Sequence, residues 1–457
     1  MKTLQADIVI IGAGLTGLTM AYYLKKAGLK VVVLDKRDRV GGVIHTCIED
    51  GFTYEAGPNT GVISSPELVQ LFRDLNLQFE VPGAASKQRW IWKKGKWHAL
   101  PSSLMSAIKT PLFPLKDKIN ILGEPFRKKG NDPDETVDVM VRRRMGGSFL
   151  TYAVDPFISG IYAGDPSTLV TRYALPKLYN LEQQYGSFVK GAVKKSKLPK
   201  SELDKQVTKE VFSVRGGLSK LIEALIDNLE EKDFILPVSD VSVEYKEARY
   251  RTSFKKEGEE QFISSARVVT TVDGVALPSL LPFLSAEILK QLSGIRYAKV
   301  VQVVAGYKHW HGIDIKAFGG LVPSVEKKDV LGILFPSALF ENRTPEGGAL
   351  LSVFMGGMKR PDIIEKSDDE IAGMAVNAIK EMMQTDSNPD LIRVFRYERA
   401  IAQYEKSSGL RFSVIREVER NYPGLVLAGN IRDGIGMSDR VKQAKTVVDQ
   451  ILTEQKA

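Results

Sequence analysis

Three glycines near the start of the chain have the spacing of a phosphate-binding turn. Gly12, Gly14 and Gly17 directly follow the apolar run 7–11 and precede residues that favour a helix as far as Ala27. In such a turn the first glycine permits a tight bend, the second lets a pyrophosphate approach the backbone, and the third lets helix and strand pack closely. The free N–H groups and the dipole at the helix start then favour an anion.

An acidic residue stands where a bound dinucleotide would place a ribose. The apolar run 31–34 ends on Asp35, whose carboxylate can accept hydrogen bonds from a ribose diol. A nicotinamide enzyme of this kind usually continues into a crossover helix. Here a short loop with Arg39, Gly41 and Gly42 follows instead, and then Gly57-Pro58-Asn59. This arrangement resembles the amine-oxidase-like flavoproteins, in which that loop lies along FAD, so the predicted cofactor is FAD.

The C-terminal region repeats the strand, glycine turn and helix. A buried strand at 425–428 is followed by Gly429 and Asn430, and Gly434 to Gly436 open a helix that extends to Ile451. In flavoproteins with a discontinuous FAD domain, such a unit sets a helix N-terminus against the flavin pyrimidine edge. No second strand-associated glycine triplet occurs, so we expect oxygen or another external acceptor to reoxidise the flavin. The residues expected to contact FAD are Gly12, Gly14, Leu15, Thr16, Gly17, Asp35, Lys36, Arg39, Gly41, Gly42, Gly57, Pro58, Asn59, Val238, Gly429, Asn430, Gly436 and Met437.

Composition excludes several other classes of protein. The 457 residues are enough for two or three domains, and the single Cys47 excludes an internal disulfide and fits a reducing cytoplasm. No apolar run approaches the ~20 residues of a membrane span, and the N-terminus is not expected to be a signal peptide. The net charge of +9 gathers at 127–129, 142–144 and 190–209. No nucleic-acid-binding motif accompanies it, which leaves an acidic substrate, an anionic membrane surface or a solvated basic face.

Metal and nucleophile chemistry have little support. His309 and His311 stand two apart, but no third histidine or cysteine is near them, so no metal site is predicted. No nucleophile elbow and no phosphate-binding lysine loop occur.

Motifs in the middle and at the end of the chain carry a more specific resemblance. They are PFISGIYAGDP at 156–166, GGLVPS at 319–324, AGN at 428–430, GIGMSD at 434–439, and DETV at 134–137 with the arginines 142–144. In this order, and over essentially the whole chain, they are similar to the protoporphyrinogen oxidase family. The resemblance implies a six-electron oxidation of protoporphyrinogen IX to protoporphyrin IX in haem synthesis, with FAD as cofactor, oxygen as acceptor and hydrogen peroxide as product. It assigns no acid–base residue, because the flavin accepts the hydride and pyrrole protons can leave to water.

The same resemblance suggests which residues contact the substrate. Arg89 matches the position that pairs with a propionate, and Phe354 the position that stacks against a pyrrole. The other positions matched to the macrocycle are Gly164, Phe318, Leu321 and Leu334. Taken without the resemblance, the apolar ones could be ordinary core residues and Arg89 a surface arginine on a strand.

Several alternatives stay open at this point. Coproporphyrinogen III oxidase carries a similar Gly-Ile-Tyr-Ala-Gly-Asp segment, although Arg89 and 57–59 favour protoporphyrinogen IX. An amine oxidase or a carotenoid desaturase of the same fold is a further alternative, and Lys299 stands in a strand comparable to that of the amine-oxidase lysine. A flavin-binding scaffold without turnover would have no need of a substrate cation.

The expected architecture is α/β with three parts. A discontinuous Rossmann-like FAD-binding domain comprises 1–75, 210–285 and 421–457, and a mixed α+β substrate-binding domain comprises 76–103 and 286–420. Residues 104–209 form a mainly helical, membrane-associating domain. Within these parts the periodicity predicts helices at 137–145 and 218–229 and strands at 238–271, 300–307, 332–336, 350–354 and 392–397.

The helical part leads to predictions about location and partners. Leu104, Met105, Ile108, Leu112 and Phe113, interleaved with Lys109 and Lys116, could lie in a bilayer interface or cap the substrate pocket as core. We expect a cytoplasmic protein, peripheral on the inner face of the cell membrane. Its predicted partners are a porphyrinogen, oxygen, the membrane surface and the next haem-pathway enzyme; a homodimer is also considered, and nucleic acid is not.

Overall fold

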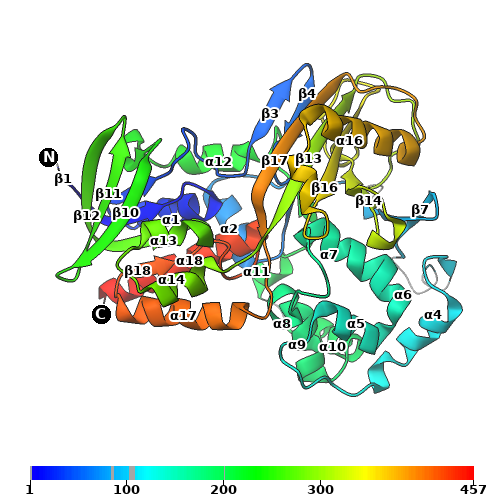
Figure 1. Cartoon of the computed structure of the whole chain (residues 1–457), viewed down its shortest axis with the longest axis horizontal. Helices are drawn as coiled ribbons and strands as arrows, with labels where there is room; N and C mark the ends of the chain where they lie inside the picture. The colour runs from blue at the N-terminus through cyan, green and yellow to red at the C-terminus, as the bar shows by residue number, and fades with distance from the viewer. Residues whose placement is uncertain (1–2, 84–86, 102–105, 107–108, 200, 457) are drawn as a thin grey trace.

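The first large sheet joins segments that lie far apart in the sequence (Figure 1). The computed structural model describes residues 3–83, 87–101, 106, 109–199 and 201–456. Within them the strands run in the order β10–β11–β12–β1–β2–β9, and β18 pairs with β12 outside this path. The pairs that β1 makes with β12 and β2 are parallel, as are β2–β9 and β12–β18, whereas β10–β11–β12 is antiparallel. The strands are β1 (Thr3–Ile11), β2 (Val31–Leu34), β9 (Phe234–Ile235), β10 (Ser239–Lys246), β11 (Arg249–Lys256), β12 (Glu259–Thr270) and β18 (Leu425–Leu427).

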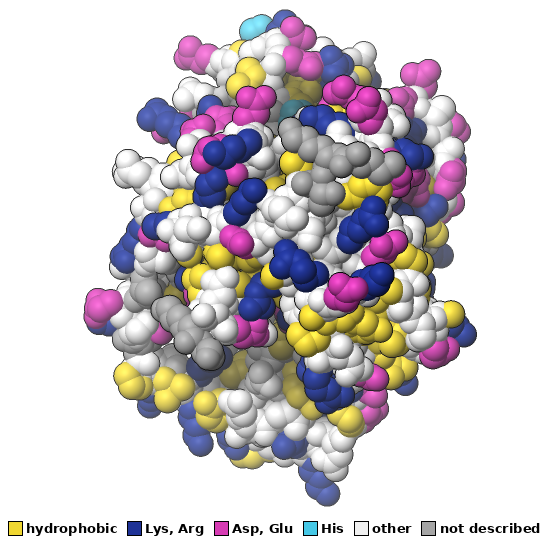
Figure 2. All heavy atoms as spheres, turned by 90° about the vertical axis from the view of Figure 1, so that its left-hand side faces the viewer, with side chains coloured by type: hydrophobic (Ala, Val, Ile, Leu, Met, Phe, Trp, Pro, Cys, Tyr) yellow, Lys and Arg dark blue, Asp and Glu magenta, His cyan; other side chains and the backbone are white. Residues whose placement is uncertain are grey.

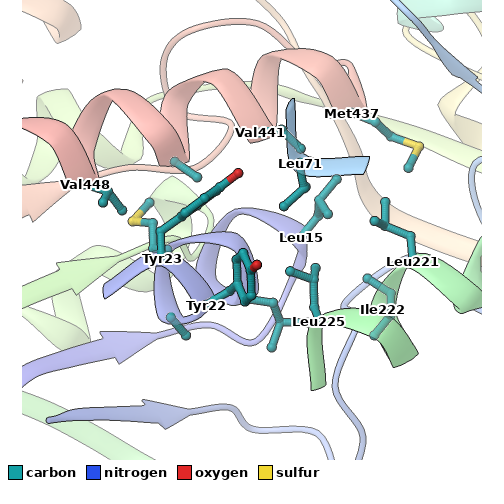
Figure 3. Close-up of a cluster of buried hydrophobic side chains, with 14 of the residues drawn as sticks. Leu15, Tyr22, Tyr23, Leu71, Leu221, Ile222, Leu225, Met437, Val441 and Val448 are labelled. Atoms are coloured by element: carbon teal, nitrogen blue, oxygen red, sulfur yellow. The ribbon is translucent and has the colours of Figure 1, made fainter. Parts of the chain in front are cut away.

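Helices bury both faces of this sheet, which explains why β1 and β2 are continuous apolar runs. Ile8 and Ile10 pack on one face, against the cluster drawn in Figure 3, and Val9 and Ile11 pack on the other. The first face is covered by α1 (Leu15–Lys26), α2 (Pro66–Asp74), α12 (Ser219–Ile226) and α18 (Met437–Lys456). The second is covered by α13 (Leu277–Leu280), α14 (Ala286–Ser293) and α17 (Ser408–Asn421).

The second large sheet carries one helix on one of its faces. Its order is β17–β13–β16–β15–β14–β6–β7, and α16 (Asp368–Met383) packs against side chains such as Val303 and Val353. The strands are β6 (Arg89–Lys93), β7 (Lys96–Ala99), β13 (Tyr297–Tyr307), β14 (Gly319–Leu321), β15 (Val330–Leu334), β16 (Ala349–Gly356) and β17 (Leu391–Ala402). Two small pairs, β3 (Thr46–Glu49) with β4 (Phe52–Glu55) and β5 (Gly61–Val62) with β8 (Val211–Phe212), lie outside both large sheets. Short elements are η4 (Glu231–Asp233), η5 (Gly274–Ala276), η6 (Ser324–Glu326), α15 (Pro336–Leu339) and η7 (Pro361–Glu365).

A third region is built from helices between β7 and β8 (Figure 1). Its elements are α4 (Leu115–Leu122), η2 (Glu124–Phe126), α5 (Val137–Met145), α6 (Gly147–Phe149), η3 (Leu150–Val154), α7 (Asp155–Tyr162), α8 (Thr171–Ala174), α9 (Pro176–Tyr185), α10 (Phe188–Ser196) and α11 (Glu202–Lys205). Residues 147–162 form one continuous helix with a wide π-type turn at η3.

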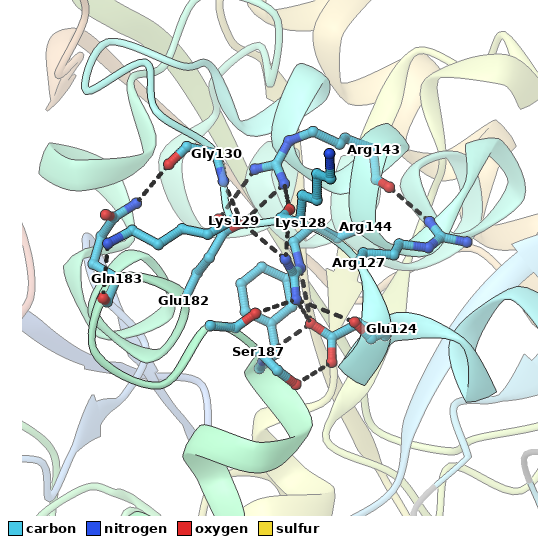
Figure 4. A network of polar contacts seen from close by, with 12 residues as sticks. Glu124, Arg127, Lys128, Lys129, Gly130, Arg143, Arg144, Glu182, Gln183 and Ser187 are labelled. Carbon is cyan, nitrogen blue, oxygen red and sulfur yellow. Dashed lines mark hydrogen bonds and ion pairs between the residues drawn. The ribbon is translucent and has the colours of Figure 1, made fainter.

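Buried ions hold the helical region together (Figure 4). Arg144 is fully buried and pairs with Glu124 and with Glu182, both of which are also fully buried. Arg143 bridges Glu182 and Glu135. Burial by itself would raise the pKa of Glu124, but hydrogen bonds that include those from Ser187 and Arg144 outweigh it and lower that pKa. Arg143 and Arg144 therefore form ion pairs inside this region and do not contribute to a basic surface.

The predicted α/β fold is confirmed, and the structure corrects some details. The predicted helix 137–145 has the observed bounds of α5, and the predicted strand 332–336 lies two residues earlier, at β15. The domain boundaries stay a prediction, but α14 and α17, which that prediction gives to the substrate domain, pack against the first sheet.

Of the two interpretations of the segment 104–113, bilayer interface or core, the described residues support core. Leu112 and Phe113 are buried with Ile91 and Leu321, so they cap the second sheet as core. Leu104, Met105 and Ile108 lie outside the described residues. Among the described helices, none is long and apolar enough to cross a membrane. On the face shown in Figure 2, basic and acidic side chains are interspersed, so the net charge of +9 forms no single basic surface there.

Candidate active site

The glycine turn leaves the start of α1 open. Gly12 has a φ of +114°, a conformation that favours glycine, and α1 begins after Gly14 without a side-chain cap. A side-chain carbon added at Gly14 would meet no protein atom within 4 Å, whereas one at Gly17 would lie 2.0 Å from the carbonyl oxygen of Gly12. Gly17 is therefore required by packing between helix and strand. Gly14 faces open space in front of unpaired helix N–H groups, and this space fits a diphosphate.

The ribose acid and the arginine–glycine loop adjoin this space. The Oδ2 atom of Asp35 accepts a 2.7 Å hydrogen bond from the N–H of Ala13, which fixes the carboxylate beside the turn. The N–H of Gly41 donates to the carbonyl oxygen of Ala13 at 2.8 Å, and Gly42 backs directly onto Gly14. The N–H of Val238 donates to the carbonyl oxygen of Asp35 at 2.9 Å. These predicted cofactor residues are therefore brought together.

Arg39 supplies a cation in the same loop. Its Nη1 atom lies 3.4 Å from the carbonyl oxygens of Val40 and Ile44, and no carboxylate of the described residues forms an ion pair with it. Burial, followed by the charge of Arg37, lowers the pKa of Arg39. A half-buried guanidinium without an acidic partner fits a bound anion. Lys36 is exposed, and Leu15 and Thr16 are buried in the first turn of α1.

The loop 57–59 connects the two large sheets. Gln302, which is fully buried in β13, accepts a 3.0 Å hydrogen bond from the N–H of Gly57 and donates to the carbonyl oxygen of Glu55 at 2.8 Å. Ser352 of β16 donates to Oδ1 of Asn59 at 2.8 Å. Gln302 and Ser352 are functional candidates that were not predicted from the sequence. Each is a single polar residue inside an apolar strand, and this exception to the apolar pattern is the signal that could have found them.

The C-terminal turn is held by polar side chains from outside it. Gly429, at a φ of +90°, donates its N–H to Oε1 of Gln443 at 2.8 Å. The Tyr404 hydroxyl lies 3.1 Å from the Asn430 carbonyl oxygen and 2.8 Å from that of Gly434. Arg440 donates to the carbonyl oxygens of residues 432–434. Tyr404, Arg440 and Gln443 were not predicted, because they lie outside the glycine motifs that they shape.

Asp439 modifies the expected helix N-terminus at this turn. Its Oδ2 atom accepts a 3.0 Å hydrogen bond from the N–H of Gly436, the residue before α18. This N–H group is therefore already paired within the protein. Met437 is buried in the core under α1. The predicted helix start is present, but an acid stands within its first turn.

Strand register places most of the predicted substrate residues on one face of the second sheet. Side chains of residues directly opposite each other in neighbouring strands project from the same face. One such row runs Arg89, Gly319, Leu334 and Ser352, and the next runs Leu321, Gly332, Phe354 and Gln302. The glycines stand between the larger residues. We call Arg89, Phe318, Leu321, Leu334 and Phe354 the platform.

The platform is the less covered face of the sheet. Phe318, Leu321, Leu334 and Phe354 are half-buried, whereas Val303 and Val353, which face α16, are fully buried. The guanidinium of Arg89 lies 5.1 Å from the centre of the Phe318 ring and makes no hydrogen bond or ion pair with a described residue. Burial lowers the pKa of Arg89, although its side chain stays accessible to solvent. An accessible cation thus borders an accessible apolar surface.

Gly164 does not join the platform. It is buried, and the space that a side chain would occupy there is filled by Gln403 and Leu169. Packing explains why this position is a glycine, and its contact with substrate stays a prediction. Gly160 has the closer relation to the platform, since a side-chain carbon there would lie 2.5 Å from Leu321.

Lys299 is engaged by two carboxylates. Its Nζ atom pairs with Glu365 at 3.0 Å and with Glu398 at 3.4 Å, and these contacts raise its pKa. The lysine considered for the amine-oxidase alternative is thus held by two carboxylates.

A cavity of about 730 Å³ lies between the helical region and the C-terminal turn. Phe149, Ala153 and Phe157 line it at intervals of four residues, and Gly160, three residues after Phe157, abuts Leu321. One face of the helix 147–162 therefore borders first the cavity and then the platform. The opposite wall of the cavity includes Tyr404, Gly434 and Asp439.

Comparison with known proteins gives this site a family. The profile of the flavin containing amine oxidoreductases matches residues 15–452. The chain belongs to this family. Protoporphyrinogen oxidase 1 of Arabidopsis thaliana chloroplasts is 30% identical, over 97% of this chain and 87% of that protein. Coproporphyrinogen III oxidase of Bacillus subtilis is 25% identical over 98% of both chains. A crystal structure from Exiguobacterium sp. 255-15, provisionally named a protoporphyrinogen oxidase, superposes with a TM-score of 0.82 at 24% identity and covers 99% of this chain.

As a flavin-containing amine oxidoreductase, the protein uses FAD, and the residues present fit this cofactor. The open space at Gly14, the carboxylate of Asp35 and the unpaired Arg39 match a diphosphate with a ribose. In the residues that the structure describes, no cluster of three or more potential metal ligands occurs.

Proposed function

We propose that this protein oxidises a porphyrinogen to the porphyrin, with protoporphyrinogen IX as substrate and molecular oxygen as electron acceptor. The observation that carries the proposal is the polar junction between the cofactor loop and the platform. Gln302 and Ser352 contact loop 57–59, and they stand in the same cross-strand rows as Phe354 and Leu334. An apolar macrocycle on the platform would therefore lie beside the cofactor loop.

The residues of the first sheet hold the cofactor in this proposal. The turn at Gly12–Gly17, with Leu15 and Thr16, receives the diphosphate, and Arg39, Gly41 and Gly42 approach it from the other side. Asp35 binds the ribose, with Lys36 and Val238 next to it, and loop 57–59 follows the ribityl chain. Gly429, Asn430, Gly436 and Met437 lie at the flavin end. Bound FAD supplies a two-electron acceptor.

The platform binds and orients the substrate. Phe318, Leu321, Leu334 and Phe354 offer apolar area to the macrocycle, and Arg89 pairs with a propionate. Orientation of a methylene bridge toward the cofactor is the main contribution of the protein, since the pyrrole protons can leave to water. Three two-electron oxidations remove six hydrogens in all, and three molecules of oxygen become three of hydrogen peroxide.

A fluorescence assay tests this function. The purified yellow holoenzyme is supplied with protoporphyrinogen IX or, in parallel, coproporphyrinogen III, and porphyrin formation is followed under air. Arg89→Ala should lower kcat/KM about 10- to 150-fold, as expected for loss of a hydrogen bond to a charged group worth about 1.5–3 kcal/mol. Lys96→Ala in the adjoining strand is the matched control and should leave kcat/KM unchanged. Absence of turnover with both porphyrinogens would contradict the proposal.

Coproporphyrinogen III is the second candidate substrate. The Bacillus subtilis relative with that name aligns over 98% of both chains, which supports keeping this candidate. The amine-oxidase alternative is less well supported, because Lys299, the lysine considered for it, pairs with Glu365 and Glu398.

We also propose peripheral attachment to an anionic membrane, through a surface other than 104–113. On α4 and η2, Leu115, Ile119, Leu122 and Phe126 are 72%, 59%, 69% and 86% exposed, and the helical residues are spaced four and three apart. Lys190 of α10 lies 5.4 Å from the Phe126 ring centre. An exposed apolar stripe beside lysines fits a lipid interface.

Vesicle sedimentation tests the attachment. Wild-type protein should sediment with anionic vesicles at low salt, and Ile119→Ser with Leu122→Ser should weaken this several-fold while enzyme activity in detergent is retained. Equal sedimentation of both proteins, or none, would contradict the proposal. Cytoplasmic location, a homodimer and docking to the next haem-pathway enzyme stay predictions.

A further inference from the structure

The cavity between the helical region and the C-terminal turn carries opposite charges on its two walls. Arg172 and Lys177 contribute cations from α8 and α9 of the helical region. Asp433 and Asp439 contribute acids from the C-terminal turn and α18. The remaining lining is largely apolar and aromatic, with Phe149, Phe157, Tyr173 and Phe412 among its side chains. Such a cavity favours a large apolar ligand with negative charge on one side.

The two acids are occupied by their own surroundings. Asp433 accepts hydrogen bonds from Nε of Arg432 at 2.9 Å and from Nε2 of Gln443 at 3.0 Å. Asp439 accepts the N–H of Gly436 at 3.0 Å. These acids shape the turn and do not neutralise the cations on the opposite wall.

The cations have unused hydrogen-bonding capacity. Arg172 pairs with Asp134 through Nη2 at 2.6 Å and stacks 4.5 Å from the centre of the Tyr173 ring. Its Nε atom is buried and has no hydrogen-bond partner. The Nε atom is out of reach of the cavity, but the side chain as a whole is 32% exposed. Its remaining N–H groups can therefore donate to an acceptor in the cavity. Lys177 is exposed and forms no ion pair or hydrogen bond with a described residue.

We propose that Arg172 and Lys177 form a second carboxylate-binding position for the porphyrinogen, separate from Arg89. Arg89 is not among the residues that line this cavity. Carboxylates on one edge of a macrocycle would satisfy only one of the two positions. Both are filled together by a ligand with carboxylates on several sides, as in coproporphyrinogen III, which carries a propionate on every ring. This inference rests on the proposed function and extends the substrates that the site accepts from protoporphyrinogen IX to coproporphyrinogen III.

Substrates with and without free carboxylates test the second position. Arg172→Gln and Lys177→Gln are assayed with coproporphyrinogen III and with its tetramethyl ester. The expected result is an approximately tenfold loss of kcat/KM for the acid in Arg172→Gln, as for one charged hydrogen bond in a partly exposed site, and a smaller loss in Lys177→Gln. The ester should be used equally by variants and wild type. Equal losses for acid and ester would overturn the proposal, since they would show a structural effect.

Two further measurements separate binding from folding. Titration of the product coproporphyrin III, followed by quenching of its fluorescence, should show the same weakening in Arg172→Gln without any turnover. Asp134→Asn removes the ion pair and keeps the cation, so it should bind the product at least as well as wild type. If Asp134→Asn weakens binding as much as Arg172→Gln, the ion pair and not the cation matters, and the proposal fails. A protein that oxidises neither porphyrinogen refutes the proposed function instead.

Discussion

Replacement of Gln302 by leucine tests whether the junction between the sheets holds the cofactor loop. Leucine keeps the side chain large and apolar in the fully buried interior of β13. It removes the acceptor for the N–H of Gly57 and the donor to the carbonyl oxygen of Glu55, which lie 3.0 Å and 2.8 Å from the glutamine. The change therefore leaves two backbone groups of one loop without a partner.

The structure sets the size of the effect. A buried polar group without its partner costs about 1–3 kcal/mol, so Gln302→Leu should lower the free energy of unfolding by about 2–6 kcal/mol. The loop can recover part of this by moving toward water, which displaces it from the cofactor. We therefore expect a lower melting temperature together with FAD binding that is weakened about tenfold or more.

The assay compares two matched variants. Gln403→Leu makes the same substitution at a glutamine that is 1% exposed and donates to the carbonyl oxygens of Tyr162 and Ile401, away from loop 57–59. Thermal unfolding and the fluorescence of released FAD are measured for both variants. Gln403→Leu should lose stability and keep its FAD affinity. If Gln302→Leu keeps wild-type FAD affinity, or if both variants lose FAD alike, the junction does not position the loop.

Three other predictions concern the cofactor turn and the helical region. Gly14→Val should fold and lack FAD, because its side chain enters space free of protein atoms, whereas Gly17→Ala should lose stability, since its carbon would lie 2.0 Å from the Gly12 carbonyl oxygen. Circular dichroism and flavin absorbance distinguish the two outcomes, and a yellow Gly14→Val protein would contradict the assignment. Arg144→Met should destabilise the protein by about 3–5 kcal/mol in thermal or denaturant unfolding, since it leaves two buried carboxylates without this partner. The same carboxylates make stability depend on pH. Burial raises the pKa values of Glu124 and Glu182, but the hydrogen bonds that they accept outweigh burial, so both pKa values lie below the ordinary 4.5. Their stabilisation is complete above about pH 4.5 and is lost as the pH falls below it. Acid unfolding that is identical in wild type and Arg144→Met would speak against this.

The sequence predicted those parts of the site that depend on local backbone chemistry. Gly12, Gly17 and Asp35 act within one strand–turn–helix–strand unit, so their spacing sufficed. The strands of the second sheet were also predictable from their apolar runs. Their order was not, because register between β6, β14, β15 and β16 depends on tertiary pairing.

Contacts between distant segments could not be read from the chain. Gln302 meets Gly57 across 245 residues, and nothing local marks either as a partner of the other. Gly164 shows a related limit of motifs. Its small size accommodates Leu169 and also Gln403, which lies far from it in the sequence, so the family motif alone does not reveal this packing. The arginines 142–144 looked like a surface charge cluster because sequence alone cannot show that Glu124 and Glu182 accompany Arg144 into the interior.

The parallel pairing of β1 with β12 affects how the protein can fold during translation. Of the two neighbours of β1, β2 follows at once, but β12 is synthesised only about 260 residues later, and α18, which packs against α1, starts at Met437. At a translation rate of about 5–20 residues per second, the glycine turn is synthesised tens of seconds before β12 and α18. We therefore expect nascent chains that stall before Met437 not to retain FAD.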